Sequence, residues 1–284
     1  MTTAKREISL SEVLGSYLCY TPSSTETHAF FADLRTMNHT LLRDSIQECQ
    51  QAKKEEGAPA GLPKRHLIHM VYTRKVKELA SLYPFLFATE NALRAIAHEA
   101  YHNNFKDAFW WREVLNAADH GKNAGHYPTK GDGKKRIQKQ PVNPSFLTEC
   151  FYGVSQLSQR QKKKLQDVNC PSTQFYDELT IRHLFNLILS DLSVCPVGNL
   201  KKEQFKAHMT TICDARNEVF HGRPIKNRSS LYGACEIILD AACFHMGDFD
   251  EALRTTTYTR LTPSRKRNPK HLLPPQAVGL GTPA

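Results

Sequence analysis

The chain has 284 residues, of which 40% are hydrophobic, and a formal net charge of +10 with a pI near 9.2. That length fits one large domain or two small ones, and the hydrophobic content is enough to bury a core, so a wholly disordered chain is not expected. The excess of Lys and Arg favours anionic partners such as nucleic acid, although a basic protein without such a partner has the same charge.

The N-terminal residues and the cysteines indicate the kind of compartment in which the protein is found. The first ten residues are polar and charged, and no apolar run approaches 18 residues, so neither a secretion signal nor a membrane span is expected. The cysteines are scattered, with no C-x-x-C, and mostly fall in apolar helical settings: Cys19, Cys49, Cys150, Cys170, Cys195, Cys213, Cys235 and Cys243. This pattern predicts buried thiols in a cytoplasmic protein rather than disulfides or a zinc site.

Helical periodicity dominates the N-terminal part and predicts an all-α fold. Ser9, with Glu12 three residues later, forms a capping-box pattern that opens a short helix through Tyr17. A long helical segment is expected from Ser23, with one apolar face composed of Phe30, Phe31, Leu34, Met37, Leu41, Leu42 and Ile46. After a loop over 59–63, a further helix is expected over 67–82. We expect residues 1–82 to form a helical region that packs on the core.

The next helix should begin near Pro84, because proline suits the first turn of a helix. It carries Glu90 and Arg94, whose spacing with the acid first predicts a favourable intrahelical pair. The alternative is that this helix lines a dimer cleft and that Glu90 orients Arg216 or His221. Trp110 and Trp111 follow, and we expect them to pack in the core and at a helix end, with stacking on a nucleic-acid base as the alternative.

A glycine- and proline-containing basic stretch interrupts the helical pattern from His120 to Ser145. Its cations are Lys122, Lys130, Lys134, Lys135, Arg136 and Lys139. We expect a loop here, within an insertion spanning about 120–168, that also holds a second basic cluster at Arg160 and 162–164. Either cluster is able to follow an RNA backbone, but a solvated charged face explains such runs more often.

Three further helices are expected over 177–192, 201–221 and 229–246, with Leu179, Leu184, Leu187 and Ile188 in the core. These complete a domain spanning 83–254. From 255 to 284 the composition changes to Thr, Pro, Arg and Lys without apolar periodicity. That segment is predicted to be a disordered basic tail, with 265–267 acting as a nonspecific electrostatic arm.

The segment Arg216-Asn217-Glu218-Val219-Phe220-His221-Gly222 places an arginine, an amide and a histidine at one helix end. Arg supplies a permanently charged fork for phosphate oxygens, and imidazole transfers protons near pH 7, so the set suits RNA cleavage without a metal. Asn217 and His221 are four apart and share a face, and Gly222 suits the residue after the helix. The alternative is that Arg216 and His221 simply tie off the helix end.

The Arg216–His221 segment resembles the R-x4-6-H motif of HEPN domains, the helical ribonucleases of toxin–antitoxin and abortive-infection systems. Upstream, Glu90-Asn91-Ala92-Leu93-Arg94, followed by Phe109-Trp110-Trp111, resembles the early helix of Abi-like members. The resemblance implies a HEPN-like helical bundle over about 83–246 that pairs as a homodimer. It also implies that the protein acts on RNA, with tRNA as a candidate target, and that an antitoxin or another regulatory partner is a candidate binding partner. No cofactor and no metal are expected.

The residues to which this interpretation assigns roles fall into two groups. The catalytic group is Arg216, Asn217, His221 and Glu90. The RNA-binding group is Arg94, Arg223, Lys134, Lys135 and Arg136. In the expected mechanism the RNA's own 2′-hydroxyl is the nucleophile, His221 transfers a proton, Arg216 binds the scissile phosphate and Asn217 orients either residue.

Two other function classes remain open. His98-Glu99-Ala100-Tyr101-His102 is a literal H-E-x-x-H, which on a helix offers two zinc ligands and a base. The metzincin continuation fails at Phe105 and Ala108, and acidic third ligands have only weak candidates in Glu113 and Asp119. The second class is a noncatalytic helical module that binds RNA or a protein partner. No P-loop, G-x-G-x-x-G or G-x-S-x-G motif is present.

Overall fold

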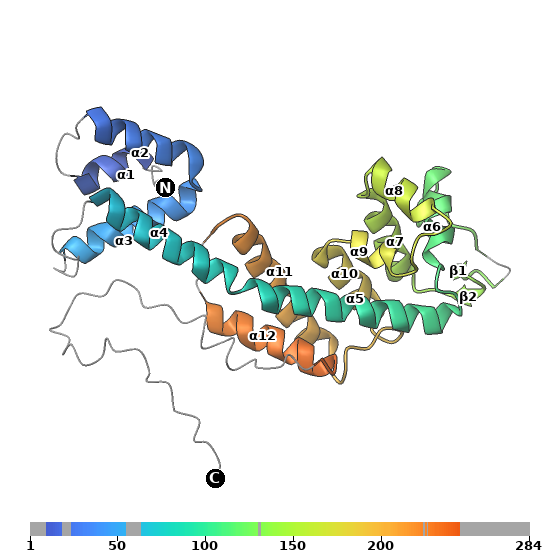
Figure 1. The fold of residues 1–284 in the computed structure, drawn as a ribbon. Helices are drawn as coiled ribbons and strands as arrows, with labels where there is room; N and C mark the ends of the chain where they lie inside the picture. The colour runs from blue at the N-terminus through green and yellow to red at the C-terminus, as the bar shows by residue number, and fades with distance from the viewer. Residues whose placement is uncertain are drawn as a thin grey trace, which may run out of the picture. The chain divides into compact units, whose positions relative to one another are not determined.

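The structure is a computed structural model that describes residues 10–18, 24–54, 64–129, 132–223, 225 and 227–244. The chain is all-α, as expected, and over these ranges its one sheet is a two-stranded hairpin (Figure 1). The described residues divide into two compact units, the first ending at Glu78 and the second beginning at Leu79. The sequence-based boundary was drawn at Leu82.

The first unit contains α1 (Leu10–Leu18), α2 (Ser24–Thr36), α3 (His39–Lys54) and most of α4 (Lys64–Ala80). Each helix contributes apolar side chains to one core, in which α1 packs against α3. The core comprises Val13, Leu14, Tyr17, Leu18, Phe30, Leu42, Ile46, Cys49, Leu67, Ile68 and Val71. The burial of an apolar face on every helix explains why the period of 3.6 is visible in the sequence.

The long helix expected from Ser23 is in fact two helices, α2 and α3, separated at Met37 and Asn38. The side chain of Asn38 accepts a hydrogen bond from the Leu41 backbone N–H at 3.1 Å, which starts a new helix. Phe31, expected on the apolar face, is 55% exposed, because Phe30 and Asp33 occupy the inward face of α2. The apolar spacing continues across the break between α2 and α3. Spacing alone therefore did not predict that break.

Asp33 is a buried acid that joins α2 to α4. Its two carboxylate oxygens accept hydrogen bonds from Nε and Nη2 of Arg65, each at 2.9 Å. Oδ2 also lies 3.0 Å from Nε2 of His69. Burial by itself raises the pKa of Asp33, but the hydrogen bonds and charges of Arg65 and His69 outweigh burial and hold the pKa below its usual value.

The second unit is arranged around the 23-residue helix α5 (Tyr83–Phe105), which has proline in its first turn as expected. The remaining elements are α6 (Trp111–Asp119), β1 (Arg136–Ile137), β2 (Gln140–Pro141), α7 (Pro144–Ser155), α8 (Gln159–Gln166), α9 (Gln174–Glu178), α10 (Ile181–Ser190), α11 (Lys202–Phe220) and α12 (Arg228–Ala241). Helix α5 contacts α9, α10 and α12, and α11 pairs with α12. In Figure 1, α12 follows the N-terminal half of α5, while α6 and the hairpin lie near its C-terminal end.

Aromatic side chains fill the core of this unit. Trp110 and Trp111 are both fully buried, which confirms the core role predicted for them. Trp110 Nε1 donates to the Tyr176 hydroxyl at 3.0 Å, and the Trp111 ring stacks on Phe175 with centroids 5.6 Å apart. The predicted core leucines and isoleucine of 179–188 are buried as well. Base stacking by these two tryptophans is therefore not possible in this conformation.

The described cysteines are free thiols, and all but Cys243 are buried. Burial raises the pKa of the Cys213 and Cys235 thiols to about 11, which disfavours the reactive thiolate. The prediction of buried thiols is thus confirmed for six of the seven cysteines that the structure describes, and Cys243 is the exception. Cys19 and the segment 245–284, including the basic tail, lie outside the described residues.

The region expected to be a basic insertion contains regular structure. Helices α7 and α8 lie within 120–168, and the Asn143 side chain caps α7 by accepting from the Ser145 N–H at 2.9 Å. Two-residue strands are too short to show alternation, so the hairpin was not predicted. The helix expected from Asp177 begins instead after Thr180, whose hydroxyl caps α10. No helix of the described residues is both long enough and apolar enough to cross a membrane.

Candidate functional site

The C-terminal end of α11 forms the sharp stop that Gly222 predicted. Gly222 has a φ of +62°, its N–H bonds to the Val219 carbonyl at 3.1 Å, and the Arg223 N–H bonds to the Glu218 carbonyl at 2.7 Å. This is a Schellman-type closure, which satisfies the last carbonyls of a helix by a left-handed glycine. The backbone N–H of His221 still bonds to the Asn217 carbonyl at 3.0 Å, so His221 directly follows the helix with its side chain exposed.

Glu90 of α5 joins two arginines of different elements. Its Oε1 accepts from Nη2 of Arg94 at 2.6 Å, and its Oε2 accepts from Nε of Arg216 at 3.4 Å. The Glu90 side chain is only 12% exposed, so these contacts are poorly screened by water. Glu90 therefore forms the intrahelical pair with Arg94 that its spacing predicted, and it also contacts Arg216 of α11.

Arg94 is held almost entirely by the chain itself. Its Nε donates to the Tyr176 carbonyl at 3.0 Å, and its Nη2 also lies 3.4 Å from the Leu179 carbonyl. Both carbonyls belong to the segment around α9, which spans Gln174–Glu178. Through these bonds Arg94 connects α5 to that segment. The bonds also leave fewer N–H groups of Arg94 for the RNA contact expected from the sequence.

Arg216 is anchored on one side and open on the other. Its Cζ lies 4.6 Å from the centroid of the Phe220 ring, so the guanidinium stacks toward the end of α11. With Nε bonded to Glu90, neither Nη group has a hydrogen-bond partner among the residues that the structure describes. The side chain is 28% exposed, and Asn217 and His221, which follow it in the last turn and at the end of α11, are exposed as well. The two Nη groups of Arg216 are thus charged donors that an approaching anion is able to reach.

A cluster of exposed aromatic rings adjoins Arg216, and it was not predicted from the sequence. Tyr83 and Phe87 of α5 stack with centroids 5.7 Å apart, and Tyr83 meets Phe220 edge-on at 6.2 Å. Their exposed fractions are 48%, 52% and 57% in that order. The signal was present, because Tyr83 and Phe87 are four apart and Phe220 directly precedes His221, but aromatic residues in helices are usually assigned to the core.

Two of the three loop cations expected to bind RNA are engaged within the loop. Lys135 Nζ donates to the carbonyls of Ala124 and Gly125. Arg136 bonds to the Lys139 carbonyl at 2.9 Å and to Asp132 at 2.5 Å. Lys134 is exposed. The hairpin lies near the opposite end of α5 from Tyr83, and hence from Phe220 and Arg216, so the fold does not bring the loop cations and the Arg216 site together (Figure 1).

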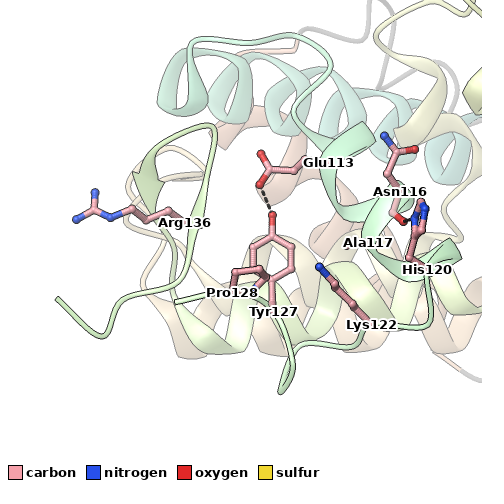
Figure 2. Close-up of a pocket in the computed structure, with 8 residues that line it drawn as sticks. All are labelled: Glu113, Asn116, Ala117, His120, Lys122, Tyr127, Pro128 and Arg136. Atoms are coloured by element: carbon pink, nitrogen blue, oxygen red, sulfur yellow. Dashed lines mark hydrogen bonds between the residues drawn. The ribbon is translucent and has the colours of Figure 1, made fainter. Parts of the chain in front are cut away.

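The same loop and α6 enclose a cavity of about 440 Å³, shown in Figure 2. Its acid, Glu113, is already bonded through one oxygen to the Tyr127 hydroxyl and through the other to the Gln138 N–H at 3.0 Å. Burial and this carboxylate raise the pKa of Tyr127 well above its usual value. In Figure 2 the Arg136 guanidinium is directed away from the other lining residues. The Glu113 carboxylate and the Tyr127 hydroxyl bond to each other, so we interpret them as part of the cavity wall rather than as a catalytic acid–base pair.

The H-E-x-x-H helix does not assemble a metal site within the described ranges. The rings of His98 and His102 are parallel with centroids 6.3 Å apart, and His98 Nε2 lies 2.9 Å from the Ser172 hydroxyl. Desolvation lowers the pKa of His98, and the nearby His102 adds to this effect. No group of three or more potential ligands capable of holding a metal forms among the described residues. The third-ligand candidates are engaged elsewhere, Glu113 as above and Asp119 with Gln166 at 2.6 Å.

The Arg216 site therefore combines an anchored guanidinium with unengaged donors, an exposed histidine and amide, and adjoining aromatic rings, all on the second unit. Comparisons with known proteins add no identification: no family model matches the sequence, and no curated protein and no solved structure matches it either.

Proposed function

We propose that the chain is a metal-independent endoribonuclease of the HEPN type, whose catalytic group is Arg216, Asn217 and His221. The observation that carries the proposal is the geometry of Arg216: Glu90 fixes its Nε, both Nη groups have no partner within the described part of the chain, and the exposed His221 directly follows the same helix. A guanidinium held in this way suits bidentate recognition of a phosphate.

The proposed reaction is an intramolecular transesterification of RNA. The 2′-hydroxyl attacks the adjacent phosphorus, the P–O5′ bond breaks, and the products carry a 2′,3′-cyclic phosphate and a 5′-hydroxyl. The hydroxyl proton must leave and a proton must reach O5′, and imidazole serves for either transfer near neutral pH. Arg216 stabilises the charge that builds on the phosphoryl oxygens, and Asn217 orients the phosphate or the imidazole.

A homodimer fits this chemistry, because two copies of His221 would supply the base and the acid separately. Such an enzyme acting on cellular RNA would arrest growth, which is the role proposed here, as a toxin or phage-defence effector. Single-stranded or looped RNA is the proposed substrate, since the 2′-hydroxyl must be free to reach the in-line position.

The test is a cleavage assay on total RNA, with chelator present. Wild type is expected to cut and to leave cyclic-phosphate and 5′-hydroxyl ends. His221→Ala is expected to reduce the rate about 100- to 10,000-fold, because general acid–base catalysis typically contributes that factor. His208→Ala, which removes a histidine from the same helix, is the matched control and should cut like wild type. Cutting by His221→Ala at the wild-type rate, or no cutting by wild type, would contradict the proposal.

A further inference from the structure

The rings of Tyr83, Phe87 and Phe220, called the aromatic cluster here, form a surface that the fold does not use for its own packing. All three are about half exposed, although large rings at contacting positions normally turn inward. Two helices build the cluster: Tyr83 and Phe87 share a face of α5, and Phe220 belongs to the last turn of α11. The backbone of both helices is regular, so the rings are presented on fixed supports.

The cluster is continuous with the Arg216 site. The Arg216 guanidinium covers the Phe220 ring at 4.6 Å, and Phe220 directly precedes His221. Planar apolar faces thus adjoin a cationic group over a short distance. Proteins hold unpaired nucleic acid by this combination, because bases stack on the rings while phosphates bind the cation. An apolar protein partner has less need of a charged group stacked on one of the rings.

We infer that the aromatic cluster is a stacking platform for an unpaired nucleobase next to the cleaved phosphate. The inference rests on the proposed function, and it adds a basis for choosing unpaired over duplex RNA. A base stacked on the cluster places its own sugar and phosphate beside Arg216 and His221. A base held within a duplex is covered on both faces by its neighbours and has no face left for the rings.

The experiment measures stacking separately from cutting. Single-stranded RNA oligonucleotides, each with 2-aminopurine at one position, are titrated with the His221→Ala protein, and both affinity and fluorescence quenching are recorded. Phe220→Leu, Phe87→Leu and Tyr83→Leu in that background are expected to weaken binding about 5- to 100-fold and to abolish the quenching. Tyr83→Phe keeps the ring and should bind and quench like the parent.

Tyr152→Leu is the matched control, because Tyr152 is 50% exposed on the same unit, and within the described ranges its ring meets one other ring, that of His183, edge-on. It should change neither affinity nor quenching. Unchanged binding and quenching by the three leucine variants would overturn the inference. So would a change in sedimentation velocity without a change in quenching, which would identify the cluster as a self-association surface.

Failure of this inference and failure of the proposed function give different results. If wild type cuts RNA but the His221→Ala protein causes no quenching, the protein is a nuclease and the aromatic cluster is not a stacking platform. Quenching that depends on the aromatic cluster, with no cutting by wild type, would leave a base-binding surface on a protein that does not cleave RNA.

Discussion

Glu90 is the residue on which the candidate site depends most, because one largely buried carboxylate serves two guanidinium groups. Removing its charge leaves Arg216 without a counter-charge among the described residues, and an unpaired charge in a poorly hydrated position is costly. Arg94 keeps Asp177, whose Oδ1 lies 3.9 Å from its Nε, and its two backbone carbonyl partners. Arg216 keeps its contact with Phe220. The loss should therefore affect Arg216 more.

Glu90→Gln is expected to lower the free energy of unfolding by about 1–3 kcal/mol, the usual range for a hydrogen-bonded charge. It should also slow RNA cutting, since Arg216 loses its anchor. Asp214→Asn is the control, because Asp214 pairs with Arg182 at 2.8 Å but is 63% exposed, and such pairs contribute less than about 1 kcal/mol. Thermal and denaturant unfolding of the two variants measure the difference, and equal stabilities would contradict this account of Glu90.

Asp33 should make stability depend on acidity. Because its pKa in the folded chain lies below the usual value, the unfolded chain binds this proton more tightly, and the stabilisation is present at neutral pH. It is expected to disappear as the pH falls from about 4 through the folded-state pKa. Unfolding of wild type and Asp33→Asn followed at pH 7 and pH 3 tests this: the variant should be less stable at pH 7 and lose less on acidification. A parallel loss in both proteins would assign the acid sensitivity to other groups.

Single residues were predictable where local spacing decides the outcome. The Glu90–Arg94 pair follows from four-residue spacing, and the burial of Trp110 and Trp111 follows from their size and apolar surroundings. The contacts of Lys135 and Arg136 with their own loop were not predictable. They depend on the loop's folded path, which no periodicity describes.

At the scale of elements, Gly198 sets the approach of the segment before α11 to the end of α12. Its φ is +52°, and a Cβ there would lie 2.7 Å from the carbonyl oxygen of Ala241, the last residue of α12. Gly198→Ala must therefore displace backbone as well as adopt a strained conformation. Gly121, at φ +73° with open space around it, shares only the strain.

Gly121→Ala is expected to cost about 1–2 kcal/mol, the usual penalty of a left-handed conformation for alanine. Gly198→Ala should cost about 1–3 kcal/mol more, since the contact with Ala241 adds overpacking. Both variants are compared with wild type by thermal unfolding. Equal losses of stability in the two variants would show that the end of α12 moves away easily. The close approach of Gly198 to Ala241 would then not affect stability.

Helices were predicted best where both a cap and an apolar face are present in the sequence. The helix expected over 201–221 is α11, spanning Lys202–Phe220, and its stop at Gly222 was predicted from the glycine. The break between α2 and α3 was missed because the apolar spacing continues across Asn38, whose capping role is visible only from its bond to Leu41. Propensity and spacing do not distinguish a capping asparagine from one on a solvated face.

For the whole molecule, the prediction concerns charge beyond the described residues. The segment 255–284 has no acidic residue and five cations: Arg260, Arg265, Lys266, Arg267 and Lys270. If the segment is the electrostatic arm predicted from its composition, replacing these five by glutamine should reduce the slope of log affinity against log salt. Each lost phosphate contact on single-stranded RNA contributes about 0.7 to that slope. Titrations of the His221→Ala background with RNA at several salt concentrations measure it, and an unchanged slope would exclude the arm.

The arrangement of the candidate site at this scale was only partly predictable. The sequence predicted that Arg216 and His221 occupy one helix end, because they are close in the chain. It did not predict that the cations at 134–136 lie near the other end of α5, since only the packed fold determines which distant segments meet. For the same reason, the contact between Phe220 and Tyr83, which are 137 positions apart, was not visible in the sequence.

Both tryptophans of the chain, neighbours in sequence, are enclosed in the core of the second unit. Intrinsic emission excited at the red edge of the indole band will consequently monitor that core alone, while the unit ending at Glu78 contributes no indole signal. Circular dichroism at 222 nm responds to the helices of both. Recording the two signals in one denaturant titration therefore shows, without any added label, whether the unit ending at Glu78 unfolds together with the second unit or separately from it.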